Sequence, residues 1–339
     1  MLFPRCMTGR KPFVTCHGYL MPCCWFDIPR YSTNGKIRDD NWELAENIFL
    51  RDAFDLKKRS YEDIINSEEW LLVLEQLKLL QYHPCKMKCS NMLLVDGRVE
   101  HDEEKLDQAV IDGTLEQSID KRVFSKHFMH PGSIDTIQLE LTNRCSLKCP
   151  YCPRQTDMPK NADIPFFVLD DVMTSKHWRV VDDVGNYGDS IFYPHYHDFI
   201  RLLISCSVDL YLGHIAATGR PKIWWWETIN EWGRLVDSGT EVKIYWGIDG
   251  LEETSKKHRI GQNWDEIVYA MKMAADVGVK SVWQWIPMSF NEHEIDKAKE
   301  LANQWGVELY IHTSCRFRKG DPNIPKNPNY HRDLYNVRV

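Results

Sequence analysis

From about residue 135 onward, short runs rich in β-branched and apolar residues alternate with stretches whose apolar positions recur at helical spacing. This alternation is typical of βα units around a parallel sheet. The pattern predicts six strands, at residues 136–141, 179–184, 208–216, 241–248, 281–287 and 307–313. Because there are six units and not the eight of a closed barrel, we expect an α/β fold with a partial (βα)6 barrel over residues 135–315.

Two of the later helices have clear ends in the sequence. They are predicted at residues 263–277 and 292–305, and each is followed at once by a glycine, Gly278 or Gly306. Glycine is favoured there because it adopts the left-handed conformation that ends a helix. In the segment SFNEHE, we expect the Asn291 side chain to cap the second helix.

The first 110 residues follow a different pattern. A turn-rich segment with several cysteines comes first, then an irregular stretch, and then a helix at about residues 67–80. The sequence therefore predicts a small α+β domain at 1–110, a polar linker at 111–134, the barrel at 135–315 and a tail at 316–339.

Charge and hydropathy exclude several classes of partner. The 339 residues include 42 Lys and Arg against 49 Asp and Glu, a net charge of -7, which offers no basic surface for nucleic acid. No apolar run approaches the roughly 18 to 20 residues that span a bilayer. The start MLFPRCMTGRK lacks the apolar core of a signal peptide. We therefore expect a cytoplasmic protein that binds neither nucleic acid nor membrane.

The eleven cysteines point to metal or cluster ligation, because a cytosolic chain does not keep structural disulfides. In IQLELTNRCSLKCPYCPR, Cys145, Cys149 and Cys152 follow the first strand with C-x3-C-x2-C spacing. This is the end of a βα fold where active sites form. Three thiolates can hold three irons of a 4Fe-4S cubane and leave the fourth iron open. A zinc site or a purely electron-transferring cluster, each normally with four ligands, is the alternative.

These residues resemble the radical S-adenosylmethionine (SAM) superfamily, whose members carry this spacing with an aromatic residue before the third cysteine, here Tyr151. The resemblance extends over about residues 136–313. It implies that SAM chelates the open iron, and that an electron from the cluster cleaves SAM to a 5'-deoxyadenosyl radical, which abstracts a substrate hydrogen. It also implies an external reductant such as flavodoxin or ferredoxin.

The turn after the second strand matches a further motif of this family. The segment GNYGDSIFYP places Asn186, Tyr187, Gly188 and Asp189 where relatives carry a Gly-Gly-Glu turn. By that match, backbone carbonyls and the Asp189 carboxylate would face the amino group of SAM. An ordinary Gly-Asp turn is the alternative.

The fourth strand ends in YWGIDGLEETSKKHRIG, which also resembles a family segment. The match implies that Asp249 ends the strand and that Arg259 approaches the SAM carboxylate or the substrate. The chain departs from the pattern at Gly247, where a serine is common, so one hydroxyl contact to SAM is missing. A plain Asp-Gly turn followed by an exposed arginine is the alternative.

A second set of cysteines lies near the amino terminus, in the spacing C-x11-G-x4-C around Gly18 and in HPCKMKC. A glycine at a hairpin turn lets two cysteines of one ribbon converge. The arrangement resembles the SPASM or twitch auxiliary-cluster module of radical SAM enzymes, here placed before the barrel. Cys16 and Cys24 are alternative ligands, and structural zinc competes with a second iron-sulfur cluster. The predicted ligands are Cys6, Cys23, Cys85 and Cys89.

The predicted activity is oxidative or peptide- and protein-directed modification, because relatives with such modules often act on peptides. One alternative is a small-molecule radical SAM oxidoreductase or cofactor-maturation enzyme. Another is a non-catalytic iron-sulfur electron-transfer protein. Cys315, just beyond the sixth strand, is a candidate catalytic thiol that faces the substrate or donates hydrogen, or else an inert cysteine.

Overall fold

The computed structural model describes residues 12–24, 52–78, 93–95, 98–100, 135–155, 160–314, 317 and 320–331. The chain divides into two units, of which the first is formed by residues 1–138 and 174–177 and the second by residues 139–173 and 178–337. Among the described helices, none is long and apolar enough to cross a membrane.

A parallel sheet organises the described part of the second unit, with strand order β10-β9-β8-β7-β6. Strand β5 (Thr136–Leu139) precedes it in the chain, and its last residue Leu139 accepts a hydrogen bond from the Val184 amide just past β6 (2.8 Å). All six predicted strands are present, each within about two residues of its predicted bounds. The parallel strands are β6 (Val180–Asp183), β7 (Asp209–Ile215), β8 (Val242–Gly247), β9 (Lys280–Trp285) and β10 (Glu308–Ile311).

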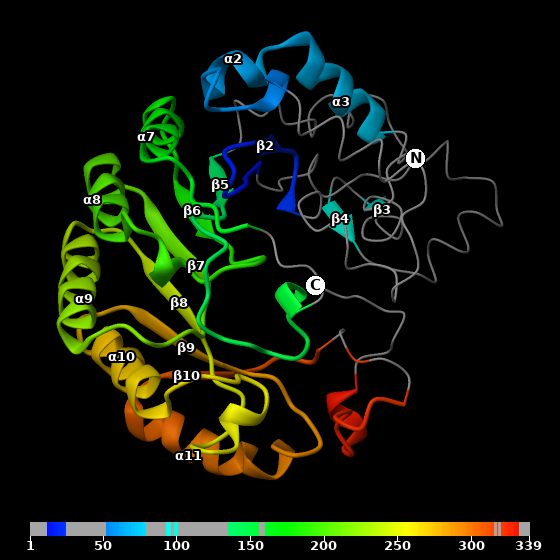
Figure 1. Cartoon of the computed structure of the whole chain (residues 1–339), viewed down its shortest axis with the longest axis vertical. Coiled ribbons are helices and arrows are strands. Elements are labelled where there is room, and N and C mark those ends of the chain that lie inside the picture. Colours follow the sequence, from blue (N-terminus) through cyan, green and yellow to red (C-terminus); the bar gives the residue numbers. More distant parts are fainter. Residues whose placement is uncertain are drawn as a thin grey trace. The chain divides into compact units, whose positions relative to one another are not determined.

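The helices of this unit follow the outer face of the strands (Figure 1). The contact of α9 with the sheet is aromatic. Trp225 and Trp232 of α9 pack on Trp246 of β8, with ring centroids 6.3 and 6.2 Å away. Burying such large rings supplies much of the free energy that holds helices on a sheet. The helices are α7 (Phe166–Thr174), α8 (Tyr196–Cys206), α9 (Lys222–Asp237), α10 (Trp264–Asp276) and α11 (Ile295–Trp305).

The opposite face of the sheet is more polar. Along β8, the buried Trp246 points to the helices, so Lys243 and Tyr245 project from the other side because side chains alternate along a strand. Tyr245 meets Tyr310 of β10 there, with ring centroids 6.4 Å apart. Closure of this sheet into a partial barrel stays a prediction.

The helix ends agree with the sequence in two cases and correct it in a third. Gly278 and Gly306 both have positive φ, 87° and 67°, just beyond α10 and α11. Asn291 precedes the short 3-10 helix Glu292–Glu294 but makes no capping hydrogen bond. Its side chain instead accepts from the Met288 amide and donates to the carbonyls of Asp249 and Ile286. The predicted cap was wrong because this amide joins the loops after β8 and β9.

In the first unit, a short hairpin joins β1 (Phe13–Val14) and β2 (Leu20–Met21). Gly18 lies in its turn with φ 81°, as the cysteine spacing predicts. The predicted helix at 67–80 is α3 (Glu68–Lys78), preceded by α2 (Tyr61–Ile65), and residues 79–80 lie outside the described ones. A second hairpin joins β3 (Leu93–Val95) and β4 (Arg98–Glu100), and the predicted linker at 111–134 lies outside the described residues.

Candidate functional site

Three cysteines share the loop of residues 142–155, here called the cluster loop, which follows β5. Cys145 and Cys152 are half-buried, Cys149 is buried, and all three are free thiols. Local hydrogen bonds shape the loop, because the Leu147 amide donates to Cys145 Sγ (3.4 Å) and the Cys152 amide to the Cys149 carbonyl (2.9 Å). The loop thus carries three thiols within eight residues.

Hydrogen bonds attach the cluster loop to the loops that follow three successive strands. One bond reaches the loop after β6, one the loop after β7 and one the loop after β8. They hold the cluster loop at the carboxyl edge of the parallel sheet. The bonds run from Asp189 N to Arg144 O (2.9 Å), from Ser146 Oγ to Thr218 O (2.6 Å) and from Lys148 N to Ile260 O (2.9 Å).

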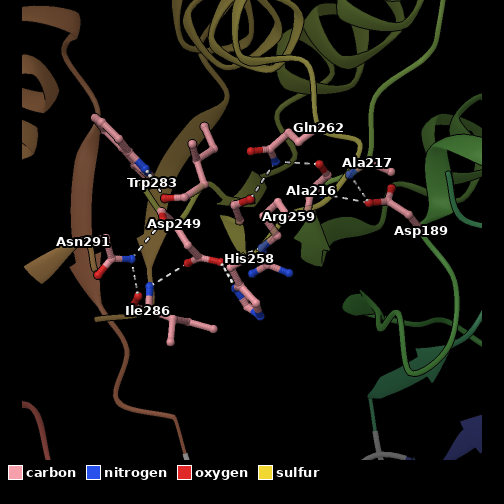
Figure 2. A network of polar contacts seen from close by, with 12 residues as sticks. Asp189, Ala216, Ala217, Asp249, His258, Arg259, Gln262, Trp283, Ile286 and Asn291 are labelled. Carbon is pink, nitrogen blue, oxygen red and sulfur yellow. Dashed lines mark hydrogen bonds and ion pairs between the residues drawn. The ribbon is translucent and has the colours of Figure 1, made fainter. Parts of the chain in front are cut away.

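A buried ion pair lies beside this loop (Figure 2). Asp249, fully buried just past β8, lies 2.5 Å from Arg259 Nε and 2.7 Å from His258 Nδ1, and it accepts the Ile286 amide at 2.7 Å. Burial alone would raise the pKa of Asp249, but Arg259 and His258 outweigh burial and hold the pKa far below its usual range. Asp249 therefore stays ionised and fixes the Arg259 side chain.

Arg259 also touches the cluster loop. The positive charge of its guanidinium lowers the pKa of the Cys149 thiol, against the larger raising effect of burial. Arg259 is buried, with 8% of its surface exposed, so the alternative of an exposed arginine after a plain turn was wrong. A cation next to the sulfur stabilises its thiolate form.

The donor set fits an iron-sulfur cubane. Burial raises the pKa of Cys145 to about 12, and the nearby Asp189 adds to that shift, so ligation would release protons from the thiols. Each cysteine of a cubane binds a different iron, and three thiols from one loop suit that need. Within the described ranges, no group of three or more His, Cys, Asp or Glu is arranged to hold a single metal ion.

Asp189 links two of the loops at this edge. Its Oδ2 accepts the Ala216 and Ala217 amides at 2.8 and 2.7 Å, and its Oδ1 accepts the Ile191 amide at 3.4 Å. Burial raises the pKa of Asp189, and these amides oppose the rise. One carboxylate oxygen is thus committed to the loop after β7, while Oδ1 carries only a long bond.

The turn before Asp189 lies against the end of β5. A Cβ on Gly188 would collide with the carbonyl oxygen of Thr142, so the backbones approach as only glycine allows. The Tyr187 amide donates to Glu140 Oε1 (2.7 Å), and both Asn186 and Tyr187 are half-buried. The turn thereby lies next to the start of the cluster loop.

Gly247 ends β8 with its carbonyl bound by Gln262, whose Nε2 donates to the carbonyls of Gly247 (3.0 Å) and Ala216 (2.7 Å). A Cβ at Gly247 would collide with the His214 imidazole. A serine would not fit at this position, because the His214 side chain of β7 occupies the space that its side chain would need.

Tyr151 is half-buried within the cluster loop. Its hydroxyl contacts the Asp321 carboxylate and Asn323 Nδ2, each at 2.8 Å. Its ring lies 5.7 Å from that of His258 and 5.4 Å from that of Phe317. The aromatic residue of the motif is therefore held by a segment far along the chain.

The auxiliary-site prediction falls only partly on described residues. Cys16 and Cys23 are buried and Cys24 is half-buried around the first hairpin. Four of the predicted site residues lie outside the described ones: Cys6, Cys85, Cys89 and Cys315.

Sequence reasoning missed several residues that shape the site. Glu140 and His258 each stand next to a motif already singled out, so closer attention to LELTNRC and KKHRIG would have found them. Gln262 and His214 carry no local signal, because their roles arise only where β7 and β8 lie side by side.

No family model matches this chain, and no curated protein matches it. Solved structures do. SuiB of Streptococcus suis bound to S-adenosylmethionine matches with a TM-score of 0.42 and 11% identity over 66% of this chain, which spans about half of SuiB (54%). TYW1 with a lysine-pyruvate adduct matches with a TM-score of 0.37 and 13% identity, over 76% of this chain and 85% of TYW1. The cobalamin-dependent S-adenosylmethionine radical enzyme OxsB matches with a TM-score of 0.35 and 15% identity, over 66% of this chain and 33% of OxsB.

Proposed function

We propose that this chain is a radical SAM enzyme, which reductively cleaves SAM to a 5'-deoxyadenosyl radical and abstracts a hydrogen from its substrate. One observation carries the proposal: three thiols lie on a single loop that is hydrogen-bonded to the loops after β6, β7 and β8. Sulfur ligands and potential ligand-binding loops therefore meet at the edge of a parallel sheet where βα proteins build active sites.

Cys145, Cys149 and Cys152 would hold a 4Fe-4S cluster with one iron open to SAM. When bound, the cluster supplies the electron for carbon-sulfur cleavage, and the chain supplies position and protection from water. The contact of Arg259 with Cys149 supports this role, because a buried cation stabilises the thiolate that iron requires.

SAM would bind over the ends of β6 and β8. Asn186, Tyr187 and Gly188 would present backbone groups to its amino group, and Asp189 its Oδ1. Because Asp249 engages Arg259 through Nε, the terminal nitrogens of Arg259 are left for Cys149 and for the SAM carboxylate.

The substrate is proposed to be a peptide or protein, on the strength of the auxiliary-cluster module alone. Cys16 and Cys24 remain alternative ligands there, Cys315 remains a candidate hydrogen donor, and a flavodoxin or ferredoxin would supply electrons. The proposed ligands of the second cluster are Cys6, Cys23, Cys85 and Cys89.

The test is SAM cleavage by full-length protein reconstituted anaerobically with iron and sulfide. With dithionite and SAM, we expect 5'-deoxyadenosine. Cys145→Ala, Cys149→Ala and Cys152→Ala should each abolish it, because the cubane loses a thiolate. Cys206→Ala, at the end of α8, is the matched control and should retain it. If the wild-type protein forms no 5'-deoxyadenosine, a non-catalytic electron-transfer protein becomes the better account.

Iron analysis separates one cluster from two, because two 4Fe-4S clusters contain about eight irons and one contains about four. Substrate class needs its own experiment. Turnover of a small metabolite, with every candidate peptide left unchanged, would replace the peptide proposal with a small-molecule oxidoreductase.

A further inference from the structure

The His214 imidazole lies over the α-carbon of Gly247, between neighbouring strands. A Cβ built on Gly247 would collide with both Cε1 and Nε2 of the imidazole, and it would come within 3.0 Å of Arg259 Nη2. The tip of the His214 ring therefore occupies the position that a side chain at residue 247 would take, next to the end of the Arg259 side chain.

The register between β7 and β8 shifts next to His214. Leu212 pairs with Ile244 and Ile215 with Trp246, so β7 advances by three residues while β8 advances by two. An extra residue of this kind re-aims the side chains around it. Trp246 faces the helices, so the next residue, Gly247, faces the opposite and more polar side of the sheet. Because the His214 imidazole lies against Gly247, it is on that same side.

The backbone around His214 is held firmly. Two residues further on, Ala216 donates its amide to Asp189 and its carbonyl accepts from Gln262, whose amide also bonds the Gly247 carbonyl. These bonds tie the ends of β7 and β8 together, two residues beyond His214.

This position also adjoins the cluster loop. Arg259, whose Nη2 lies next to it, pairs with Asp249 and lowers the pKa of the Cys149 thiol. A ligand seated between the cluster loop and the end of β8 would meet both Arg259 and His214. An imidazole can donate or accept a hydrogen bond there, depending on its tautomer.

We propose that His214 is a SAM-binding residue. Its imidazole, which lies where a side chain at position 247 would otherwise be, hydrogen-bonds an oxygen of SAM. This inference rests on the proposed function, since it needs SAM at the cluster loop. SAM offers such oxygens on its ribose and on its carboxylate.

The test measures the SAM dissociation constant of full-length, anaerobically reconstituted protein by equilibrium dialysis. It also follows the change that SAM causes in the electron paramagnetic resonance spectrum of the reduced cluster. His214→Ala should weaken SAM binding roughly five- to tenfold, the effect of one lost hydrogen bond. His214→Gln, which places an amide near the position of Nε2, should retain most of the affinity. Iron content and melting temperature, measured for each variant, separate lost binding from lost folding.

Gly247→Ser examines the shared space directly. The new side chain must displace the imidazole, so we expect a similar loss of SAM affinity. The double variant His214→Ala with Gly247→Ser should then bind no more weakly than either single variant, because both remove the same contact. Losses that add fully in the double variant would overturn the shared position.

Decarboxylated SAM identifies the oxygen. If His214→Ala weakens SAM and decarboxylated SAM equally, the partner is a ribose hydroxyl. If it weakens SAM alone, the partner is the carboxylate. Unchanged affinity for both ligands, in protein whose wild type binds SAM, overturns the role of His214 alone. A wild type that binds no SAM overturns the proposed function itself.

Discussion

The hydroxyl of Tyr151 lies 2.8 Å from both carboxylate oxygens of Asp321, which joins the middle of the cluster loop to a segment beyond β10. That segment is itself anchored to the loop after β9, because the Ser289 amide donates to the Asn323 carbonyl (3.1 Å) and Glu292 accepts the Lys326 amide (3.0 Å). The region predicted only as a tail therefore helps to position the cysteines.

Tyr151→Phe should loosen the cluster loop. The variant keeps the ring but removes the hydroxyl that binds Asp321, a hydrogen bond to a charged group. We expect a chelator to remove iron from the reconstituted variant roughly ten- to hundredfold faster than from wild type. Tyr310→Phe is the matched control, since Tyr310 is 43% exposed on β10. Equal rates of iron loss for Tyr151→Phe and wild type would show that this bond does not hold the loop.

Gly188→Ala should disrupt the turn after β6. The new methyl group would meet the Thr142 carbonyl oxygen, and backbone on both sides must move to admit it. We expect a lower melting temperature and loss of detectable SAM binding. Gly233→Ala, within α9, is the control, because its methyl group would meet Val277 only at an ordinary 3.5 Å. That change should stabilise the protein by about 0.5 to 1 kcal/mol. A Gly188→Ala protein with wild-type SAM affinity would contradict the close packing.

The strands and helices could be predicted because their signals are local. The helix α10, for example, begins after Asn263, whose side chain accepts the Glu266 amide (3.2 Å), and ends before Gly278. Both residues can be recognised in the sequence, because a helix-capping asparagine and a helix-ending glycine flank a run of apolar residues at helical spacing. The three motif cysteines were equally visible, because their spacing is contained within one loop.

What the sequence could not reveal depends on which strands become neighbours. At Gly247 the sequence shows only that a serine hydroxyl is missing. The structure shows that the His214 side chain of the neighbouring strand occupies that position. Asn291 was predicted to cap a helix, but its side-chain amide instead donates hydrogen bonds to the carbonyls of Asp249 and Ile286, in the loops after β8 and β9. Such contacts join residues far apart in sequence, and no short pattern encodes them.

Asp249→Asn should destabilise the protein strongly. The change keeps the side chain's shape but leaves the buried Arg259 without its charged partner. Breaking a buried pair in this way costs about 3 to 5 kcal/mol. Urea unfolding followed by tryptophan fluorescence measures the loss. Asp296→Asn, whose exposed carboxylate pairs with Lys299, is the control and should change little. An unfolding free energy equal to that of wild type would mean that the Asp249 charge does not support the fold.

Asp183→Asn should alter how stability depends on pH. Asp183 ends β6, buried, with neither carboxylate oxygen hydrogen-bonded among the described residues. Burial raises its pKa to about 8 and the nearby Asp189 adds to the rise, whereas Ser190, close but outside hydrogen-bond geometry, opposes it.

Between about pH 4 and pH 8, the folded protein would therefore hold a proton that the unfolded chain releases. The free energy of unfolding then falls as pH rises, by up to about 1.4 kcal/mol per pH unit from this group. Asparagine is neutral throughout this range. The free energy of unfolding of Asp183→Asn minus that of wild type should therefore be larger at pH 8 than at pH 5. Most other groups titrate alike in both proteins, so the difference reports on Asp183 and on the groups that it influences, Asp189 and Tyr196. Parallel stability curves for the two proteins would mean that Asp183 is ionised within the fold, with a cation or water supplying the partner that the burial of its side chain requires.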